Sequence, residues 1–151
     1  DKVRINSEID ANLIYSGKTF RNNTDILSIL LNNAFLHSGF HECPENLSIS
    51  CMLKANSDNI FFEVENNLHD SVDIEQLSYK IAQINEAYKT GVYTSLNTRQ
   101  EGGMGLYKIM LILHKTLNVK EAFYISLNDH KLKVRIKLSK EFICNEKNSI
   151  S

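Results

Sequence analysis

Residues 47–64 read LSISCMLKANSDNIFFEV, and their pattern decides the fold class. Apolar side chains alternate with more polar neighbours in two runs, which comprise Leu47, Ile49, Cys51 and Leu53 and then Ile60, Phe62 and Val64. Such alternation is typical of strands with one buried face, because successive side chains of a strand point to opposite sides. The polar residues 56–59 predict a tight turn between the runs, and therefore an antiparallel hairpin.

Helical patterns lie on both sides of this hairpin. Before it, apolar residues recur at three- and four-residue spacing and predict a buried helix over 24–35, with Ile26, Leu27, Leu30, Leu31, Ala34 and Phe35 inward. After it, a second helix is predicted from Asp73 to about residue 87, because Asp73 and Gln76 have capping-box spacing and Gly91 can end the helix. A third helix is expected after Gly105, with Leu106, Ile109, Met110 and Leu113 inward.

A second hairpin is predicted near the end of the chain, with strands over 123–127 and 132–138. Two short strands are expected near the start, over 3–5 and 11–15, with Gly17 as the break after them. Residues 92–101 are polar and aperiodic, which indicates a loop. Hairpins interrupted by helices predict an α+β two-layer sandwich, in which a mixed, mostly antiparallel sheet carries its helices on one face.

The composition is that of an average globular domain. The chain has 151 residues, with 17 Lys and Arg against 18 Asp and Glu. One domain is expected over 1–142, followed by a polar tail over 143–151. No nucleic acid is expected as a partner, because such proteins usually carry a basic excess. No apolar run approaches the roughly 20 residues of a membrane span, so no membrane contact is expected from this segment.

The three cysteines, Cys43, Cys51 and Cys144, form no CxxC pair and have no histidine at ligand spacing. They are therefore interpreted as reduced thiols of a cytoplasmic domain. Cys51 lies within the alternating run and is expected in the core.

Two segments contain amides that could bind a ligand. Residues 30–38 read LLNNAFLHS, and Asn33 and His37 share a helix face because they are four residues apart. That face could offer an amide oxygen to hydrated magnesium and an imidazole to a phosphate; alternatively, it is a helix end with exposed amides. Residues 64–68 read VENNL, where Asn66 could read the amine of a base from a strand end, or could simply favour a turn.

The third segment, EGGMGLYKI at 101–109, places Gly102, Gly103 and Gly105 directly before a helix. Glycines there let the backbone approach a ligand, and the free N–H groups and the helix dipole attract an anion. The segment is not a P-loop, because no Gly-Lys-Ser/Thr follows. A flexible hinge is the alternative interpretation.

In order and separation, these segments resemble the ATP-binding domain shared by sensor histidine kinases, the gyrase B subunit, the ninety-kilodalton heat-shock chaperones and MutL, known as the GHKL or Bergerat fold. LLNNAFLHS is similar to the family's magnesium-site helix. The resemblance implies ATP and Mg²⁺ as cofactors, with Asn33 as the magnesium ligand and His37 near the phosphates or ribose. It also implies that Asn66 stands where the family has an Asp that binds the adenine amine.

The family's glycine box is similar to Gly103-Met104-Gly105-Leu106, which Gly102 precedes. These residues would bind the nucleotide, and residues 68–101 would form a lid over it.

The chain departs from the family pattern at several positions. Ile29 stands where the family usually has an acidic or amide residue, often a glutamate that acts as general base, and an aliphatic side chain cannot take a proton. Asn66 replaces the Asp, and Leu68 and Asp70 replace the glycines expected after it. Independent ATP hydrolysis is therefore not expected, and no catalytic residue is assigned.

Two functions remain open. The domain could bind Mg-ATP and donate the γ-phosphoryl group to a histidine on another domain, within a longer parent chain or on a separate protein. It could instead be a degenerate nucleotide-sensing or protein-interaction module without catalysis.

Overall fold

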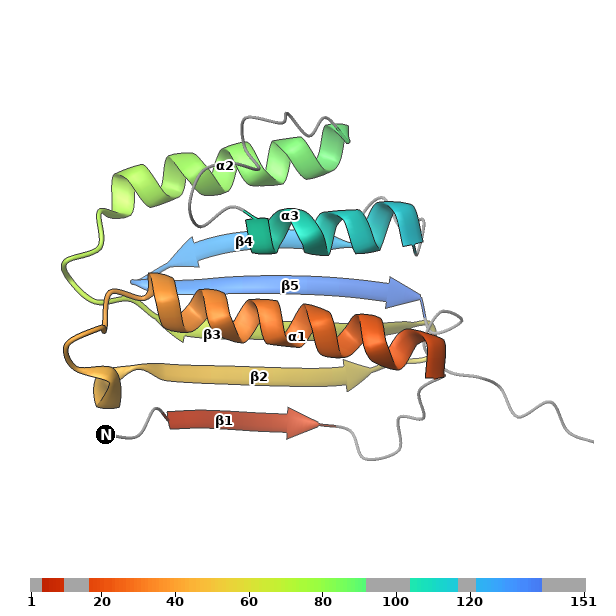
Figure 1. Cartoon of the computed structure of the whole chain (residues 1–151), viewed down its shortest axis with the longest axis horizontal. Coiled ribbons are helices and arrows are strands. Elements are labelled where there is room, and N and C mark those ends of the chain that lie inside the picture. The colour runs from red at the N-terminus through yellow and green to blue at the C-terminus, as the bar shows by residue number, and fades with distance from the viewer. Residues whose placement is uncertain (1–3, 10–16, 92–103, 117–121, 140–151) are drawn as a thin grey trace, which may run out of the picture.

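The computed structural model describes residues 4–9, 17–91, 104–116 and 122–139 (Figure 1). Its strands are β1 (Arg4–Ile9), β2 (Ser48–Ala55), β3 (Asn59–Asn67), β4 (Phe123–Asn128) and β5 (Lys131–Ser139). Its α-helices are α1 (Gly17–His37), α2 (Ile74–Thr90) and α3 (Met104–Leu111). A 3-10 turn spans Pro44–Asn46, and a π-helical turn, Ile112–Thr116, continues α3.

The five strands form one mixed sheet in the order β1-β2-β3-β5-β4. β1 runs parallel to β2, and the other pairs are antiparallel, with Val64 of β3 opposite Cys51 of β2 and Val134 of β5. The three helices cover one face of this sheet (Figure 1). The predicted α+β two-layer sandwich, with a mostly antiparallel sheet and helices on one face, is therefore confirmed.

Both predicted hairpins are present. β2 pairs with β3 from Ile49 opposite Asn66 to Ala55 opposite Ile60. β4 and β5 are joined through Asp129 and His130, which have φ values of 48° and 56°. Two consecutive left-handed residues match the twist of a tight hairpin. Of the two strands expected near the start, β1 extends the first to Ile9, and the one over 11–15 lies outside the described residues.

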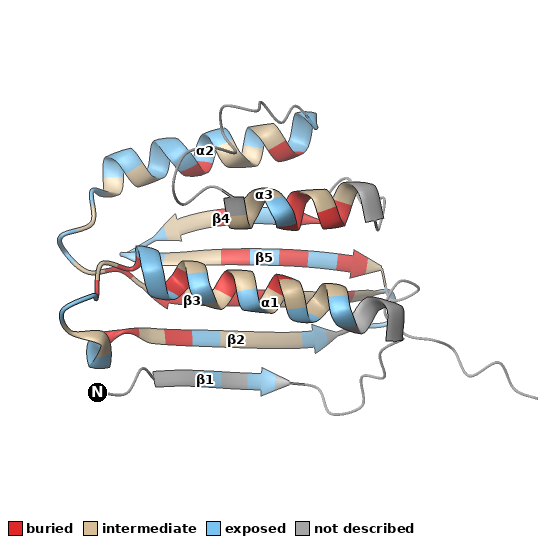
Figure 2. Ribbon diagram, in the orientation of Figure 1, coloured by how far each residue is buried: buried red, intermediate tan, exposed pale blue. Residues whose placement is uncertain are grey.

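The core lies between the helices and the sheet (Figure 2). Alternate strand residues meet one stripe of α1 and the inward side of α3, and the buried side chains include Ile26, Leu30, Ala34, Ile49, Ile60, Val64, Ile109 and Leu113. Cys51 is half-buried and packs against this core, and Cys43 and Cys51 are free thiols.

Two expectations for α1 were wrong. Phe35 is 47% exposed rather than inward. It follows Ala34 by about 100° around the helix, so the apolar pattern is wider than the stripe that the sheet covers. The helix also begins at Gly17, earlier than expected. The sequence pattern missed residues 17–23 because they have no apolar stripe, although nothing in them excludes a helix.

The ends of α2 match the sequence expectation. The Asp73 side chain caps the helix by accepting a hydrogen bond from the backbone N–H of Gln76 at 2.9 Å. Gly91 follows the last turn with φ 70°, in the left-handed region that glycine adopts without strain.

α2 is anchored to the outer strand β4. The Asn85 side chain donates from Nδ2 to the Ile125 carbonyl at 2.8 Å and accepts from the Ile125 N–H at 2.9 Å. The Tyr88 hydroxyl accepts from the Ala122 N–H at 3.2 Å. Asn85 thereby satisfies edge groups of β4 that would otherwise be open to another strand. The segment expected to act as a lid, 68–101, thus includes a helix fixed to the sheet.

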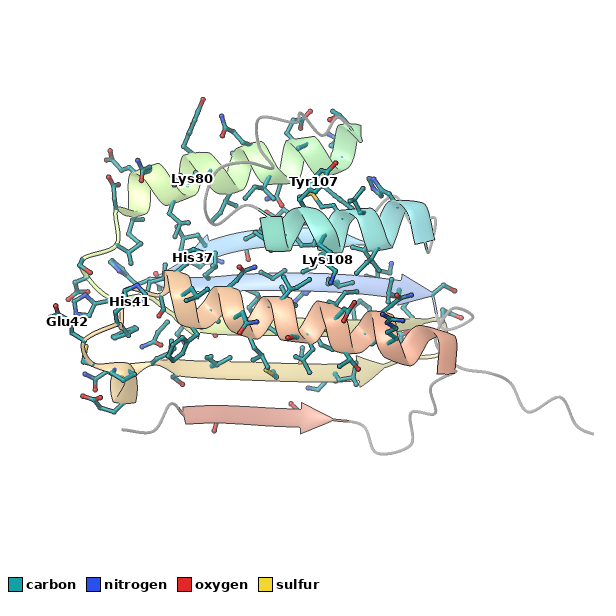
Figure 3. The ribbon with its side chains drawn as sticks, in the orientation of Figure 1. His37, His41, Glu42, Lys80, Tyr107 and Lys108 are labelled. Carbon is teal, nitrogen blue, oxygen red and sulfur yellow. The ribbon has the colours of Figure 1, made fainter. Side chains whose placement is uncertain are left out.

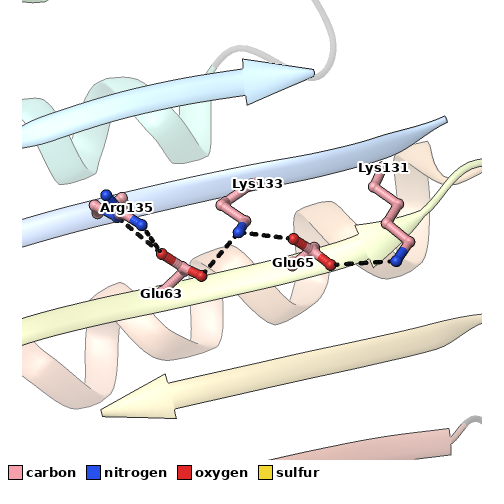
Figure 4. Close-up of polar contacts among 5 residues, drawn as sticks. All are labelled: Glu63, Glu65, Lys131, Lys133 and Arg135. Carbon is pink, nitrogen blue, oxygen red and sulfur yellow. Dashed lines mark hydrogen bonds and ion pairs between the residues drawn. The ribbon is translucent and has the colours of Figure 1, made fainter. Parts of the chain in front are cut away.

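Charged residues on the sheet face opposite the helices form a ladder across β3 and β5 (Figure 4). Glu63 accepts from Arg135 Nε at 2.8 Å and lies 3.1 Å from Lys133 Nζ, while Glu65 lies 2.9 Å from Lys133 Nζ and 3.7 Å from Lys131 Nζ. Burial raises the pKa of Glu63, but the hydrogen bonds from Arg135 and Lys133 outweigh it, so the pKa is lowered from 4.5.

Glu63→Gln is expected to lower the free energy of unfolding at neutral pH by about 1 kcal/mol, because it removes a nearly buried, hydrogen-bonded carboxylate. A lowered folded-state pKa gives stability that is present above the unfolded value and is lost as pH falls through the folded value. The difference between variant and wild type should therefore shrink with acidification in urea unfolding curves. Glu86→Gln, at an exposed site on α2, is the matched control. If the stability difference between Glu63→Gln and wild type stayed constant at every pH, this would contradict the lowered pKa of Glu63.

Candidate functional site

The glycine at the start of α3 packs directly on α1. A Cβ atom added to Gly105 would lie 2.9 Å from Cγ2 of Ile29 and 3.4 Å from both Nδ2 and Oδ1 of Asn33. Real Cβ atoms do not approach other atoms as closely as the first of these distances, so only glycine fits without a shift. The structure thus brings two of the three candidate segments into contact.

Asn33 is half-buried, but its Nδ2 atom is fully buried and has no hydrogen-bond partner in the part of the chain that the structure describes. An unpaired buried donor costs roughly 1 to 3 kcal/mol. Buried polar atoms are rarely left in this state, and an exception calls for an explanation such as a missing water, ion or ligand. An acceptor oxygen placed beside α1 and Gly105 would remove this cost.

His37 lies one helical turn after Asn33, in the last turn of α1, and its side chain is exposed (Figure 3). Partial desolvation lowers its pKa from 6.5, and the nearby charges of His41 and Lys80 lower it further. The imidazole is therefore mostly neutral at pH 7, and it can gain a proton when an anion arrives.

Asn66 and Asn67 have different roles. Asn66 is 4% exposed and lies on the helix-covered side of β3, as do Val64 and Ile60, which are two and six residues earlier in the strand. Its Nδ2 donates to the Asn67 carbonyl at 2.8 Å. Because this bond uses the amide nitrogen, Oδ1 of Asn66 is left to accept from a ligand.

Asn67 instead joins neighbouring backbone segments. Its Oδ1 accepts from the Ser48 N–H at 2.7 Å, and its Nδ2 donates to the Asn46 carbonyl at 3.0 Å. Both amide atoms of Asn67 are therefore used to hold the backbone in place, and this residue has a structural role.

The wall beyond Asn66 is apolar. Leu68 is 4% exposed, and its N–H donates to the His130 carbonyl at 2.8 Å. Asp70 is exposed. Leu68, which stands at the first position where the family would have a glycine, therefore fills space that a glycine would leave empty.

Two cavities among the described residues lie away from the contact of Gly105 with Asn33. One, of about 10 Å³, lies under the first half of α1 beside Asn23 and Ile26. The other, of about 250 Å³, is lined by Glu65, Lys131 and Lys133 on the opposite sheet face.

The remaining predicted residues lie at the glycine segment. Leu106 is half-buried and packs against the core, whereas Gly102 and Gly103 lie outside the described residues. No group of three His, Cys, Asp or Glu side chains that could hold a metal occurs among the described residues. A magnesium ion would therefore depend on Asn33 for its protein oxygen, with water and phosphate oxygens completing its shell, which suits this ion.

A family model described as "y4jQ C-terminal putative histidine kinase domain" matches residues 2–140. The chain belongs to this histidine-kinase-like family. It is thus a GHKL-type domain, as the three segments had indicated. A comparison with curated proteins found no significant match.

Two solved structures similar to this histidine-kinase-like domain are nucleotide-free crystal forms of the catalytic domain of histidine kinase ThkA. The first is 14% identical, with a TM-score of 0.55, and the aligned region covers 91% of this chain and 80% of the ThkA chain. The other is 15% identical with a TM-score of 0.56, and covers 91% and 79%. At this identity, the likeness shows the fold.

No described helix has both the length and the apolar character needed to cross a membrane.

Sequence reasoning missed the contribution of α2 to this histidine-kinase-like domain. Asn85 and Tyr88 anchor the helix, and the charge of Lys80 contributes to the lowered pKa of His37 at the end of α1. The spacing of Ile81, Ile84, Asn85 and Tyr88 on one helix side was the available signal. Nothing local, however, distinguishes an amide that binds a strand edge from one that binds water.

Proposed function

We propose that this histidine-kinase-like domain binds Mg-ATP on the helix-covered side of the sheet. The observation that carries the proposal is the contact of Gly105 with Asn33, whose buried Nδ2 has no partner among the described residues. A phosphate oxygen beside this amide would satisfy the donor, and Oδ1 would then be placed for a magnesium ion. Gly102, Gly103 and Leu106 would complete the nucleotide-binding set from the start of α3.

Asn66 is proposed to contact the base. Its amide orientation favours a ligand that donates to Oδ1, which the exocyclic amine of adenine does. The guanine oxygen at the corresponding ring position is an acceptor and would meet Oδ1 unfavourably. The proposed ligand is therefore an adenine nucleotide.

Phosphoryl transfer to a histidine on another domain is the proposed reaction, and it requires mainly positioning and charge neutralisation from the protein. Ile29 would stand in place of the base that activates water, and it packs at the Gly105 contact. Transfer without water activation is compatible with this side chain, whereas steady hydrolysis is not. The acceptor histidine would belong to another domain, and the cytoplasm is the proposed location.

A second candidate is a nucleotide-sensing or interaction module without catalysis. The buried Leu68 favours it, because this side chain occupies a position that a roomier base pocket would leave open. The proposed domain boundaries, 1–142 with a polar tail over 143–151, are the same for both candidates.

Mg-ATP is expected to raise the melting temperature of the purified domain. A ligand at about 100 times its dissociation constant adds about 2.7 kcal/mol of stability. Mg-GTP is the matched control and should give a smaller shift. No shift with millimolar Mg-ATP would overturn both nucleotide functions, and steady phosphate release would contradict the role assigned to Ile29.

A further inference from the structure

Lys80 of α2 is exposed and lies at the flank of the helix side that faces the core. Lys80 directly precedes the buried Ile81, and it has Leu77 three residues before it and Ile84 four residues after it. Residues at these spacings share one side of a helix, and both Leu77 and Ile84 pack against the core. Because the Asn85 amide is bonded to β4 in two places, this side of α2 is fixed in orientation.

The end of α1 lies within electrostatic reach of Lys80. The charges of His41 and Lys80 both act on His37, and Figure 3 shows Lys80 on α2 opposite the end of α1, with His37 in the last turn and His41 just after the helix. Glu42 follows His41 but forms no ion pair with it or with Lys80 among the described residues. These groups therefore form a set of positive or protonatable side chains without an acidic partner.

Several other described lysines form ion pairs with acidic side chains. Lys54 pairs with Glu8 at 3.0 Å, and Lys108 pairs with Asp25 at 3.4 Å. In the described part of the chain Lys80 forms no such pair, and neither do Lys89 and Lys137. What distinguishes Lys80 is its place opposite His37, which lies one helical turn after Asn33 on α1. Cations brought together without an acid favour the binding of an anion.

We propose that Lys80 binds the polyphosphate of the ligand, acting from α2 together with His37 on α1. This inference rests on the nucleotide site proposed above and adds to it a residue that the sequence motifs do not mark. Lysine is suited to this role as a compact charge on a flexible stem. Asn85 is then a positioning residue, because it fixes the helix that carries the lysine.

The test compares Lys80→Met with Lys89→Met, which removes an exposed lysine from the last turn of the same helix. Binding of ATP, adenosine and inorganic tripolyphosphate is measured by calorimetry on the purified domain. Lys80→Met is expected to weaken ATP and tripolyphosphate roughly 10-fold to 100-fold, as for loss of a charged hydrogen bond. Adenosine binding should not change, Lys80→Arg should restore most of the affinity, and Lys89→Met should resemble wild type.

The tripolyphosphate measurement separates this inference from the proposed function. If wild type binds tripolyphosphate through Lys80 but binds no nucleotide, Lys80 remains an anion-binding residue and the nucleotide site is wrong. If Lys80→Met binds ATP and tripolyphosphate as wild type does, the Lys80 inference is wrong and the nucleotide site stands. If wild type binds neither ligand, both are overturned.

A second readout tests the geometry without any ligand. In the free protein, Lys80→Met should raise the pKa of His37, because it removes one of the two charges that lower it. Lys89→Met should leave that pKa unchanged. Both values can be measured by NMR titration of the imidazole, and an unchanged His37 in Lys80→Met would contradict the proposed proximity.

Discussion

Replacing Asn33 with alanine is expected to abolish the magnesium dependence of ATP binding and to leave the free protein at least as stable as wild type. The two effects differ in sign because the Asn33 amide has a buried donor without a partner among the described residues. Removing such a donor, and placing alanine in a helix, both favour folding. Losing the proposed metal ligand and phosphate donor should weaken Mg-ATP roughly 10-fold to 100-fold.

The measurement is a thermal melt of Asn33→Ala with and without ATP and Mg²⁺. Asn32→Ala is the matched control, because Asn32 is the preceding residue of the same helix and is exposed. The control should keep the full magnesium-dependent shift. A free Asn33→Ala domain that melts well below wild type would show instead that the amide supports folding, and an unchanged Mg-ATP shift would remove Asn33 from the site.

The fold was predictable because its strands and helices have local periodic signals. The alternation from Leu47 to Val64 has one buried face and requires a partner layer. The Asp73 cap and the Gly91 end gave the bounds of α2 from chemistry that acts within one turn. The order of these elements then left one arrangement, with hairpins in a sheet and helices on one face.

The width of buried surfaces was less predictable, because it depends on what packs against each element. Phe35 continues the apolar pattern of α1, yet it is exposed where the sheet no longer covers the helix. Asn66 and Asn67 are the same residue type and adjacent in sequence, and only the register of the sheet decides which of the two side chains faces the core. One faces the core, whereas the other bonds to Ser48 and Asn46.

The candidate site was predictable only in part, for the same reason. Glycines before a helix and an amide at helical spacing indicated two surfaces, and the structure brings Gly105 and Asn33 together. The anchoring of α2 through Asn85 joins positions 40 residues apart in sequence, for which no local pattern exists. An expected lid thereby includes a helix that is fixed to the sheet.

Gly105→Ala is expected to destabilise the domain by about 1 to 2 kcal/mol and to weaken Mg-ATP at least roughly 10-fold. An exchange of glycine for alanine in a helix normally adds about 1 kcal/mol of stability, but here the new methyl group would lie 2.9 Å from Cγ2 of Ile29. That atom belongs to a β-branched side chain with one preferred rotamer, so the clash must move α3 or α1. Either movement displaces Asn33, whose amide atoms lie 3.4 Å from the new group.

A double-mutant cycle separates this clash from any other effect of the methyl group. Ile29→Ala removes the clashing atom, so Gly105→Ala should be much less destabilising, or even stabilising, in that background. Urea unfolding gives the stability of the four proteins, and melts with Mg-ATP give the binding. Recovery of both quantities in the double variant would show that close packing of α3 on α1 sets the position of Asn33. Additive losses of stability would mean instead that α1 and α3 do not meet at Ile29 and Gly105.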